Sequence, residues 1–199
     1  MTRTAKRTRS TKETSIEIVV DLDGHGDTAV ETGLPFFDHM VAQLGKHGGF
    51  DLSVRAEGDL AVDAHHTVED VGIALGECIR EALGDKAGVR RFASIDLPLD
   101  EALVSVALDL SGRPFLVYQV DPGGGAEVHP LGSPPFDPQL AEEFWRALVT
   151  SAGITLHVRM VSGRNTHHIL EASFKAVARA LRDAVRVEGR GVPSTKGTL

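Results

Sequence analysis

The sequence predicts an α+β fold made of an internally duplicated β-β-α-β-α unit, with helices packed on one face of mixed sheets. Three observations predict this fold. Residues 65–69 and 167–171 share the pattern His-His-x-x-Glu, and each copy opens a segment with apolar residues at helical spacing. A segment that alternates apolar and polar residues, as a half-buried strand does, precedes each copy. Further strand-like and helical segments follow the same order in both halves of the chain.

The first half is expected to cover residues 13–93. Its strands are predicted where apolar and polar residues alternate, at 15–22, 28–32 and 50–56. Its first helix is predicted at 37–46. The second begins at the first His-His-x-x-Glu copy and ends near Leu83, which a glycine follows.

The second half, residues 94–188, repeats this order and joins the first near residues 91–95, so that both form one integrated domain. Its strands are predicted at 103–109, 115–120 and 154–161. Its helices are predicted at 139–151 and from His167 to near Val187.

Three segments lack apolar periodicity. Residues 1–12 are basic and rich in threonine, and we expect a flexible leader there. Residues 121–138 are rich in glycine and proline, which is typical of a flexible loop. Residues 189–199 are expected to form a tail or a binding loop.

The composition excludes several classes of protein. A formal net charge of −7 argues against nucleic-acid binding, and no apolar run is long enough to cross a membrane. The single cysteine, Cys78, excludes an intrachain disulfide, and its place in an apolar helical pattern indicates a buried thiol. We therefore expect a cytoplasmic location and neither a nucleic-acid nor a membrane partner.

The two His-His-x-x-Glu copies have the composition of a metal site. Residues four apart share a helix face, so His65 with Glu69, and His167 with Glu171, can each bind one ion. Adjacent histidines point about 100° apart on a helix and are expected to serve neighbouring ions. Imidazole and carboxylate together suit Mn, Fe, Zn or Co. The copies indicate either two metals or two halves of one site; the alternative is that such histidines are surface or cap residues.

Six short segments resemble, in the same order, the imidazoleglycerol-phosphate dehydratases of histidine biosynthesis. The resemblance runs from about Glu13 to Leu199 and indicates the monofunctional form. The segments are Phe-Phe-Asp-His-Met (36–40), Asp-Ala-His-His-Thr-Val-Glu-Asp (63–70), Gly-Val-Arg-Arg-Phe (88–92), Ser-Gly-Arg-Pro (111–114), Arg-Asn-Thr-His-His (164–168) and Ser-Thr-Lys-Gly (194–197). The resemblance implies a hydro-lyase that converts D-erythro-imidazole glycerol phosphate to imidazole acetol phosphate plus water.

The resemblance also implies two Mn²⁺ ions per active site and a 24-subunit homo-oligomer. Carried over by position, one metal would have as ligands His39, His66, His168 and Glu171. The other would have His65, Glu69, His167 and a residue of the preceding helix that is often histidine in this family. Here that residue is Glu143, which is otherwise interpreted as a solvated helix residue.

The same resemblance places residues around a phosphorylated substrate. The metal ligands His39, His65, His66, Glu69, His167, His168 and Glu171 are expected to contact it, as are Gln43, His47, Arg91, Arg113, Lys175, Ser194, Thr195 and Lys196. Phosphate calls for cationic and hydroxyl donors, which the last six residues supply. Taken singly, each cation could be a surface charge, with Arg113 in a turn and Lys175 on a solvated face.

The expected reaction removes a poorly acidic carbon-bound proton close to the imidazole ring and protonates a departing hydroxyl. Metal binding to the ring nitrogens would spread the developing charge. Glu13 matches the family's N-terminal acidic substrate contact and is the candidate catalytic acid/base; otherwise it is a surface glutamate before a strand. Two alternatives remain at this point: a di-metal hydrolase, and a metal-storage shell without phosphate-binding cations.

Overall fold

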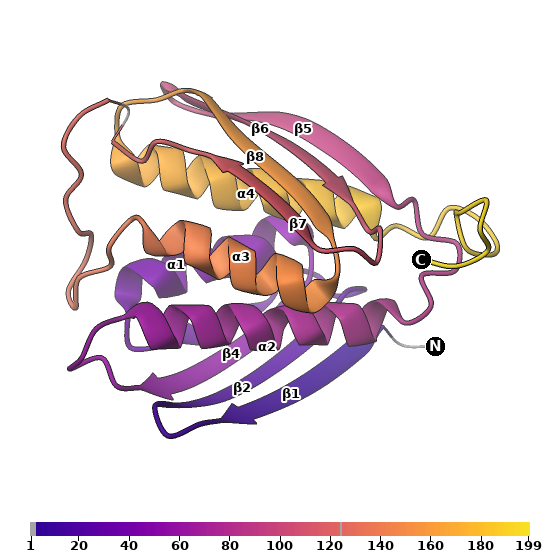
Figure 1. Cartoon of the computed structure of the whole chain (residues 1–199), viewed down its shortest axis with the longest axis horizontal. Coiled ribbons are helices and arrows are strands. Elements are labelled where there is room, and N and C mark those ends of the chain that lie inside the picture. Colours follow the sequence, from indigo (N-terminus) through magenta and orange to yellow (C-terminus); the bar gives the residue numbers. More distant parts are fainter. Residues whose placement is uncertain (1–2, 124) are drawn as a thin grey trace.

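The protein is a layered α+β structure with a sheet on each outer side and the helices between them (Figure 1). It is described by a computed structural model covering residues 3–123 and 125–199. The first half contains β1 (Thr4–Ser10), β2 (Thr14–Asp21), β3 (Thr28–Glu31), α1 (Pro35–Gly48), β4 (Asp51–Gly58) and α2 (His65–Leu83). The second contains β5 (Phe92–Leu99), β6 (Ala102–Asp109), β7 (Phe115–Gln119), α3 (Leu140–Ala152), β8 (Thr155–Ser162) and α4 (Thr166–Ala184).

Both halves have the same sheet topology. The strand orders are β1-β2-β4-β3 and β5-β6-β8-β7, and in each sheet the first two pairings are antiparallel and the last is parallel. The predicted duplication, the mixed sheets and the helices on one face of each sheet are confirmed. The helices pack across the halves, because α2 lies mainly against α3 and α1 against α4.

One strand at the start of each half was not predicted, so the unit is β-β-β-α-β-α. The expected leader at 1–12 is corrected: its residues 4–10 form β1, while residues 1 and 2 lie outside the described part of the chain. β1 is an edge strand in which only Ala5 is buried, so it lacks the apolar alternation of a strand with a buried face. It is held instead by backbone pairing with β2 and by Arg9, whose guanidinium lies 2.8 Å from the Asp70 carboxylate on α2.

The expected junction at 91–95 is corrected as well, because β5 begins at Phe92. β5 is also an edge strand, with no residue buried. Residues 121–138 contain neither helix nor named strand in their described part, as predicted for a loop. Phe136 from this loop is fully buried and stacks on Phe37 of α1 with ring centroids 5.7 Å apart.

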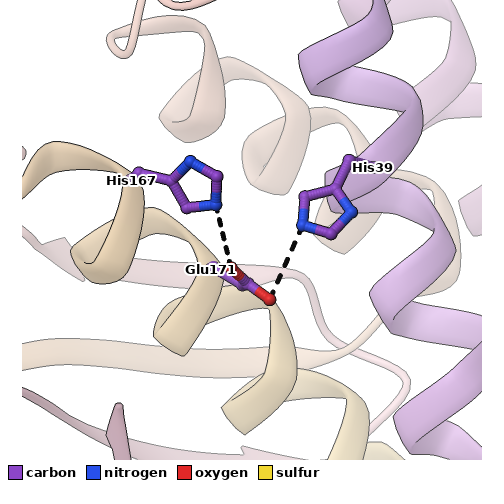
Figure 2. Close-up of side chains that lie close together, drawn as sticks. All are labelled: His39, His167 and Glu171. Carbon is purple, nitrogen blue, oxygen red and sulfur yellow. Dashed lines mark hydrogen bonds and ion pairs between the residues drawn. The ribbon is translucent and has the colours of Figure 1, made fainter. Parts of the chain in front are cut away.

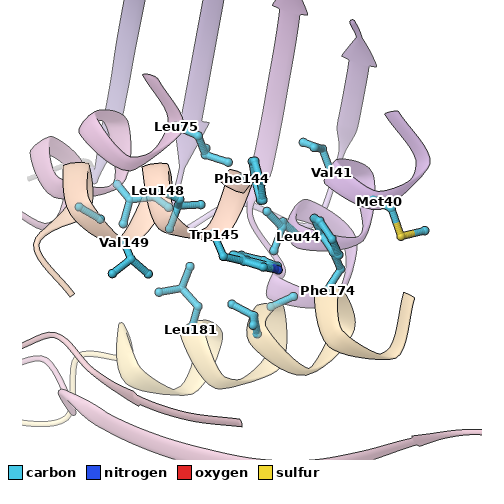
Figure 3. Close-up of a cluster of buried hydrophobic side chains, with 14 of the residues drawn as sticks. Met40, Val41, Leu44, Leu75, Phe144, Trp145, Leu148, Val149, Phe174 and Leu181 are labelled. Carbon is cyan, nitrogen blue, oxygen red and sulfur yellow. The ribbon is translucent and has the colours of Figure 1, made fainter. Parts of the chain in front are cut away.

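The core lies where the four helices meet between the sheets (Figure 3). Trp145 of α3 and Phe174 of α4 are fully buried, with ring centroids 4.6 Å apart. Cys78 is also buried, as predicted, and burial raises the pKa of its thiol to about 11. No helix in the described part of the chain is long and apolar enough to cross a membrane.

Candidate active site

The two His-His pairs stand at the first turns of α2 and α4, where a side chain just before each helix accepts hydrogen bonds from backbone N–H groups. Asn165 accepts hydrogen bonds from the backbone N–H groups of His167 and His168, at 2.9 and 3.2 Å. Asp63 accepts one from the N–H of His65 at 2.6 Å. Such side chains satisfy donors that have no partner within the helix, and they fix the orientation of the first turn.

α1 and α4 lie side by side, and each presents a row of polar residues at four-residue spacing. Such residues share one helix face. The rows are His39, Gln43 and His47 on α1, and His167, Glu171 and Lys175 on α4. The row on α4 was predicted in part from the His-His-x-x-Glu pattern. The row on α1 was missed as a pattern, although its four-residue spacing was visible in the sequence.

Glu171 is the centre of the first cluster of possible metal ligands (Figure 2). Its carboxylate lies 3.0 Å from His167 Nε2 and 3.6 Å from His39 Nε2. One ligand atom from each of these three residues lies within 4.8 Å of the others. The edge of the His167 ring packs against Phe36, with centroids 5.3 Å apart, which limits the movement of the imidazole. Two imidazoles and a carboxylate in this arrangement fit a divalent transition metal.

The electrostatics favour an ionised Glu171. Burial raises the pKa of this carboxyl, but Lys175, 2.8 Å away, together with His39 and His167, outweighs burial and lowers the pKa below its usual value. Burial and the nearby Lys175 and Arg179 lower the pKa of His47. His47 is therefore disposed to be neutral at neutral pH, and it lies beside a cationic surface of α4.

A second cluster is formed by Glu13, Asp59 and His66. His66 Nδ1 lies 3.0 Å from the nearer oxygen of Asp59 and 3.8 Å from Glu13. The hydrogen bond to Asp59 raises the pKa of His66. One turn of α2 separates His65 from Glu69, and Nε2 of His65 lies 4.0 Å from the Glu69 carboxylate.

The His168 ring lies against the β5–β6 turn. Its Nδ1 lies 2.8 Å from the carboxylate of Glu101 in that turn. This hydrogen bond, together with backbone N–H donors from Asn165 and Arg164, lowers the pKa of Glu101 to about 2. Asp59 and Glu101 were both missed from the sequence, because no spacing rule links them to the histidines they contact.

Neither four-residue ligand set expected from the family is assembled within one chain. The first set is divided, with His39 and Glu171 together, His66 beside Asp59, and His168 beside Glu101. In the second set, Glu143 is 3.6 Å from Arg146 of its own helix and belongs to neither cluster found among the described residues. A single chain therefore offers partial donor sets.

The residues expected to bind phosphate do meet in one place. A pocket of about 590 Å³ lies at the C-terminal end of the chain. It is lined by Arg91, Arg113, Pro193, Ser194, Thr195, Lys196, Thr198 and Leu199. Lys175 is the one predicted phosphate contact that does not line it. The tail at 189–199 contains no helix or strand and folds back to form one wall of the pocket.

Arg91 organises this pocket. Its guanidinium donates to both carboxylate oxygens of Asp109, at 2.7 and 3.2 Å, and to the Pro193 carbonyl at 2.8 Å. Its backbone has a φ of 77°, which is uncommon outside glycine, and its N–H donates to the Ala184 carbonyl at the end of α4. Arg91 thus connects strand β6, helix α4 and the tail, and the bidentate Asp109 contact was not foreseen.

This cationic pocket and the first cluster lie at opposite ends of α4. His167 is in the first turn of α4, whereas the backbone N–H of Arg91 is hydrogen-bonded to Ala184, the last residue of α4. A helix of 19 residues is about 28 Å long. Figure 1 shows the tail beyond the C-terminal end of α4, away from the helix starts that carry the histidines.

Comparison with known proteins decides between the dehydratase and its alternatives. A model of the family described as "Imidazoleglycerol-phosphate dehydratase" matches residues 32–181. The chain belongs to this family. Among curated relatives, imidazoleglycerol-phosphate dehydratase from Parafrankia sp. (strain EAN1pec) is 58% identical over 201 residues, covering 100% of both chains. The enzyme of Acidothermus cellulolyticus is 56% identical, covering 99% of this chain and 93% of its own.

Solved dehydratase structures agree with the fold. The imidazoleglycerol-phosphate dehydratase of Staphylococcus aureus aligns with a TM-score of 0.81 at 34% identity, covering 92% of this chain and 99% of its own. The Pyrococcus furiosus structure, a complex with (S)-C348, aligns with a TM-score of 0.78 at 37% identity, covering 97% and 100%. Like the rest of the imidazoleglycerol-phosphate dehydratase family, the chain is a hydro-lyase of histidine biosynthesis, rather than a hydrolase or a storage shell.

Proposed function

We propose that this hydro-lyase requires two Mn²⁺ ions per active site and converts D-erythro-imidazole glycerol phosphate to imidazole acetol phosphate and water. The observation that carries the proposal is the convergence of Arg91, Arg113 and Lys196 in one pocket of a chain that also carries His/Glu clusters. A metal-binding shell has no need of such a pocket, whereas a phosphorylated imidazole needs both features.

The donor chemistry fits the metal. Imidazole nitrogens and carboxylates are good ligands for Mn²⁺. His39, His167 and Glu171 already lie close enough to hold one ion jointly. His65 with Glu69, and the Nε2 atoms of His66 and His168, would supply further ligands; Nε2 of His168 lies 3.7 Å from the Asp100 carboxylate. Glu143 is the remaining candidate.

The reaction removes a hydroxyl from the carbon attached to the ring and a proton from the next carbon, giving an enol that becomes the ketone. Bound metals would act as Lewis acids toward the ring nitrogens and favour the anionic ring. Glu13 lies exposed beside His66 and has no closer hydrogen-bond partner there, so it is free to move a proton. The cationic pocket would orient the phosphate.

We also propose that chains share each site, as part of a large homo-oligomer that the family resemblance puts at 24 subunits. A substrate with three carbons between ring and phosphate cannot reach along α4 from the histidines to Arg91. The outer face of the second sheet favours self-association, since Phe92 and Phe115 are 55% and 60% exposed beside the pocket. The corresponding face of the first sheet carries charged pairs such as Lys6 with Glu17.

The direct test is turnover. Protein stripped of metal by a chelator should be inactive on imidazole glycerol phosphate, and added Mn²⁺ should restore formation of the enolisable ketone. Light scattering on the same samples should show a large species with Mn²⁺ and smaller ones without it. Full activity in the metal-free protein, or no ketone with Mn²⁺ present, would reject the proposed metal-dependent reaction. A protein that stays monomeric with and without Mn²⁺ would reject the proposed oligomer. A cytoplasmic location is proposed on the same biosynthetic role.

A further inference from the structure

The duplication places Glu13 and Glu101 at equivalent positions. Glu13 is the residue immediately before β2, and Glu101 is the residue immediately before β6. Each therefore lies in the turn that joins the first two strands of its half. Each also faces the second histidine of the His-His-x-x-Glu copy in the same half, His66 or His168.

These two glutamates make different contacts. One oxygen of Glu101 lies 2.8 Å from His168 Nδ1, and the other accepts backbone N–H groups from Arg164 and Asn165 at 3.1 and 2.8 Å. Glu13 stays 3.8 Å from His66 Nδ1. Asp59 takes that position instead, with its two oxygens 3.0 and 3.2 Å from the nitrogen.

The difference has a steric cause. Asp59 directly follows β4, and the residue that directly follows β8 is Gly163. A Cβ at Gly163 would lie 2.6 Å from Cγ1 of Ile169, which is fully buried. No carboxylate side chain fits there, so in the second half the turn glutamate has to contact the histidine itself.

We propose that Asp59 and Glu101 are positioning residues that accept the Nδ1–H of His66 and His168 and thereby present Nε2 of each ring as a metal ligand. By holding His66, Asp59 also leaves Glu13 free to act on the substrate. The inference rests on the proposed metal dependence. An ionised carboxylate only accepts hydrogen bonds, so it fixes the Nδ1–H tautomer of the neutral ring. Carboxylates in this role are a common feature of histidine-bound metals.

The test replaces each carboxylate with its amide, in Asp59→Asn and Glu101→Gln. An amide NH₂ can donate to Nδ1, which would move the ring proton to Nε2 and block the ligand atom. We expect nitrogen-15 NMR of the metal-free chain to show Nδ1–H for His66 and His168. Each variant should change only its own histidine, and the affinity for Mn²⁺ should fall about 10–100-fold.

The matched controls are Glu57→Gln and Asp96→Asn, which remove an exposed carboxylate from the neighbouring strands β4 and β5. Both should keep the wild-type tautomers and Mn²⁺ affinity. Glu13→Gln should keep them too, while its turnover falls.

Two results would overturn the inference. If wild type binds Mn²⁺ but the amide variants keep both tautomer and affinity, Asp59 and Glu101 have no positioning role and the proposed function stands. If wild type binds no Mn²⁺ at all, the proposed function fails and the metal-directed role fails with it.

Discussion

Glu171 is close to three groups that can carry positive charge. His167, His39 and Lys175 all lie within 3.6 Å of its carboxylate. Glu13, in contrast, is exposed, and its carboxylate lies 3.8 Å from His66 and within 4.8 Å of the Asp59 carboxylate. The roles proposed for the two glutamates, a metal ligand for Glu171 and an acid/base for Glu13, are therefore expected to be separable.

Amide substitution should separate these roles. Glu171→Gln replaces an anionic ligand with a weaker neutral one, so Mn²⁺ content and activity should fall together. Glu13→Gln should keep its Mn²⁺ and lose about 10²–10⁴-fold in kcat, the usual range for general acid–base catalysis. Elemental analysis and kcat on the same preparations measure both. Near-normal turnover in Glu13→Gln would end its catalytic assignment, and loss of Mn²⁺ would make it a ligand.

The individual site residues that could be predicted from the sequence are those that belong to motifs. The His-His pairs and the expected phosphate contacts were named because those residues occur in patterned or family-like segments. The sequence did not reveal Asp59, Glu101 and Asp109, whose roles depend on which strand ends lie beside which helix starts. Glu101 lies 67 residues before the histidine it contacts, so only the folded chain reveals that pair.

Helix α2 approaches α3 closely because two glycines one turn apart face it. A Cβ at Gly72 would lie 2.7 Å from the Phe144 carbonyl oxygen, and one at Gly76 would lie 2.5 Å from that of Leu148. Glycine weakens a helix interior by roughly 1 kcal/mol relative to alanine, so these residues are retained for packing. The shared surface of α2 and α3 brings the two halves together.

Gly76→Ala should therefore destabilise the protein in spite of its better helix propensity. Overpacking costs about 1–3 kcal/mol, and the obstacle is a backbone atom that cannot rotate away. Arg80→Ala, at an exposed position of the same helix, is the matched control and should change stability by less than about 0.5 kcal/mol. Urea unfolding of the metal-free chains measures both, and a Gly76→Ala protein as stable as wild type would disprove the close approach.

Most elements were predictable from the sequence, including the edge strands β3 and β7, whereas the edge strands β1 and β5 were missed. The helices and the strands β2, β4, β6 and β8 carry apolar residues on one face, so their period is visible in the sequence. β1 depends on backbone pairing and on the Arg9–Asp70 ion pair. The contacts of β1 leave no periodic signal, which is why residues 1–12 resembled a leader. β5 packs Ile95 and Leu97 against the core, and this alternation was visible in the sequence but was not interpreted as a strand.

At the scale of the molecule, one chain carries the parts of the site in separate places. α2 packs on α3 and α4 packs on α1, so the two His-His-x-x-Glu copies start helices of different pairs. The cationic pocket lined by Arg91, Arg113 and Lys196 is at the far end of α4. We therefore expect each active site to combine the first copy of one chain with the second copy of another.

Mixing two inactive variants tests this requirement most directly. One variant carries His66→Ala and the other His168→Ala, and each alone should be inactive because every site lacks a ligand. If the copies come from different chains, unfolding both together and reassembling them with Mn²⁺ should restore activity. In random mixtures roughly a quarter of the sites would receive two intact copies. A mixture that stays as inactive as either parent, while wild type treated in the same way recovers, would contradict the shared site.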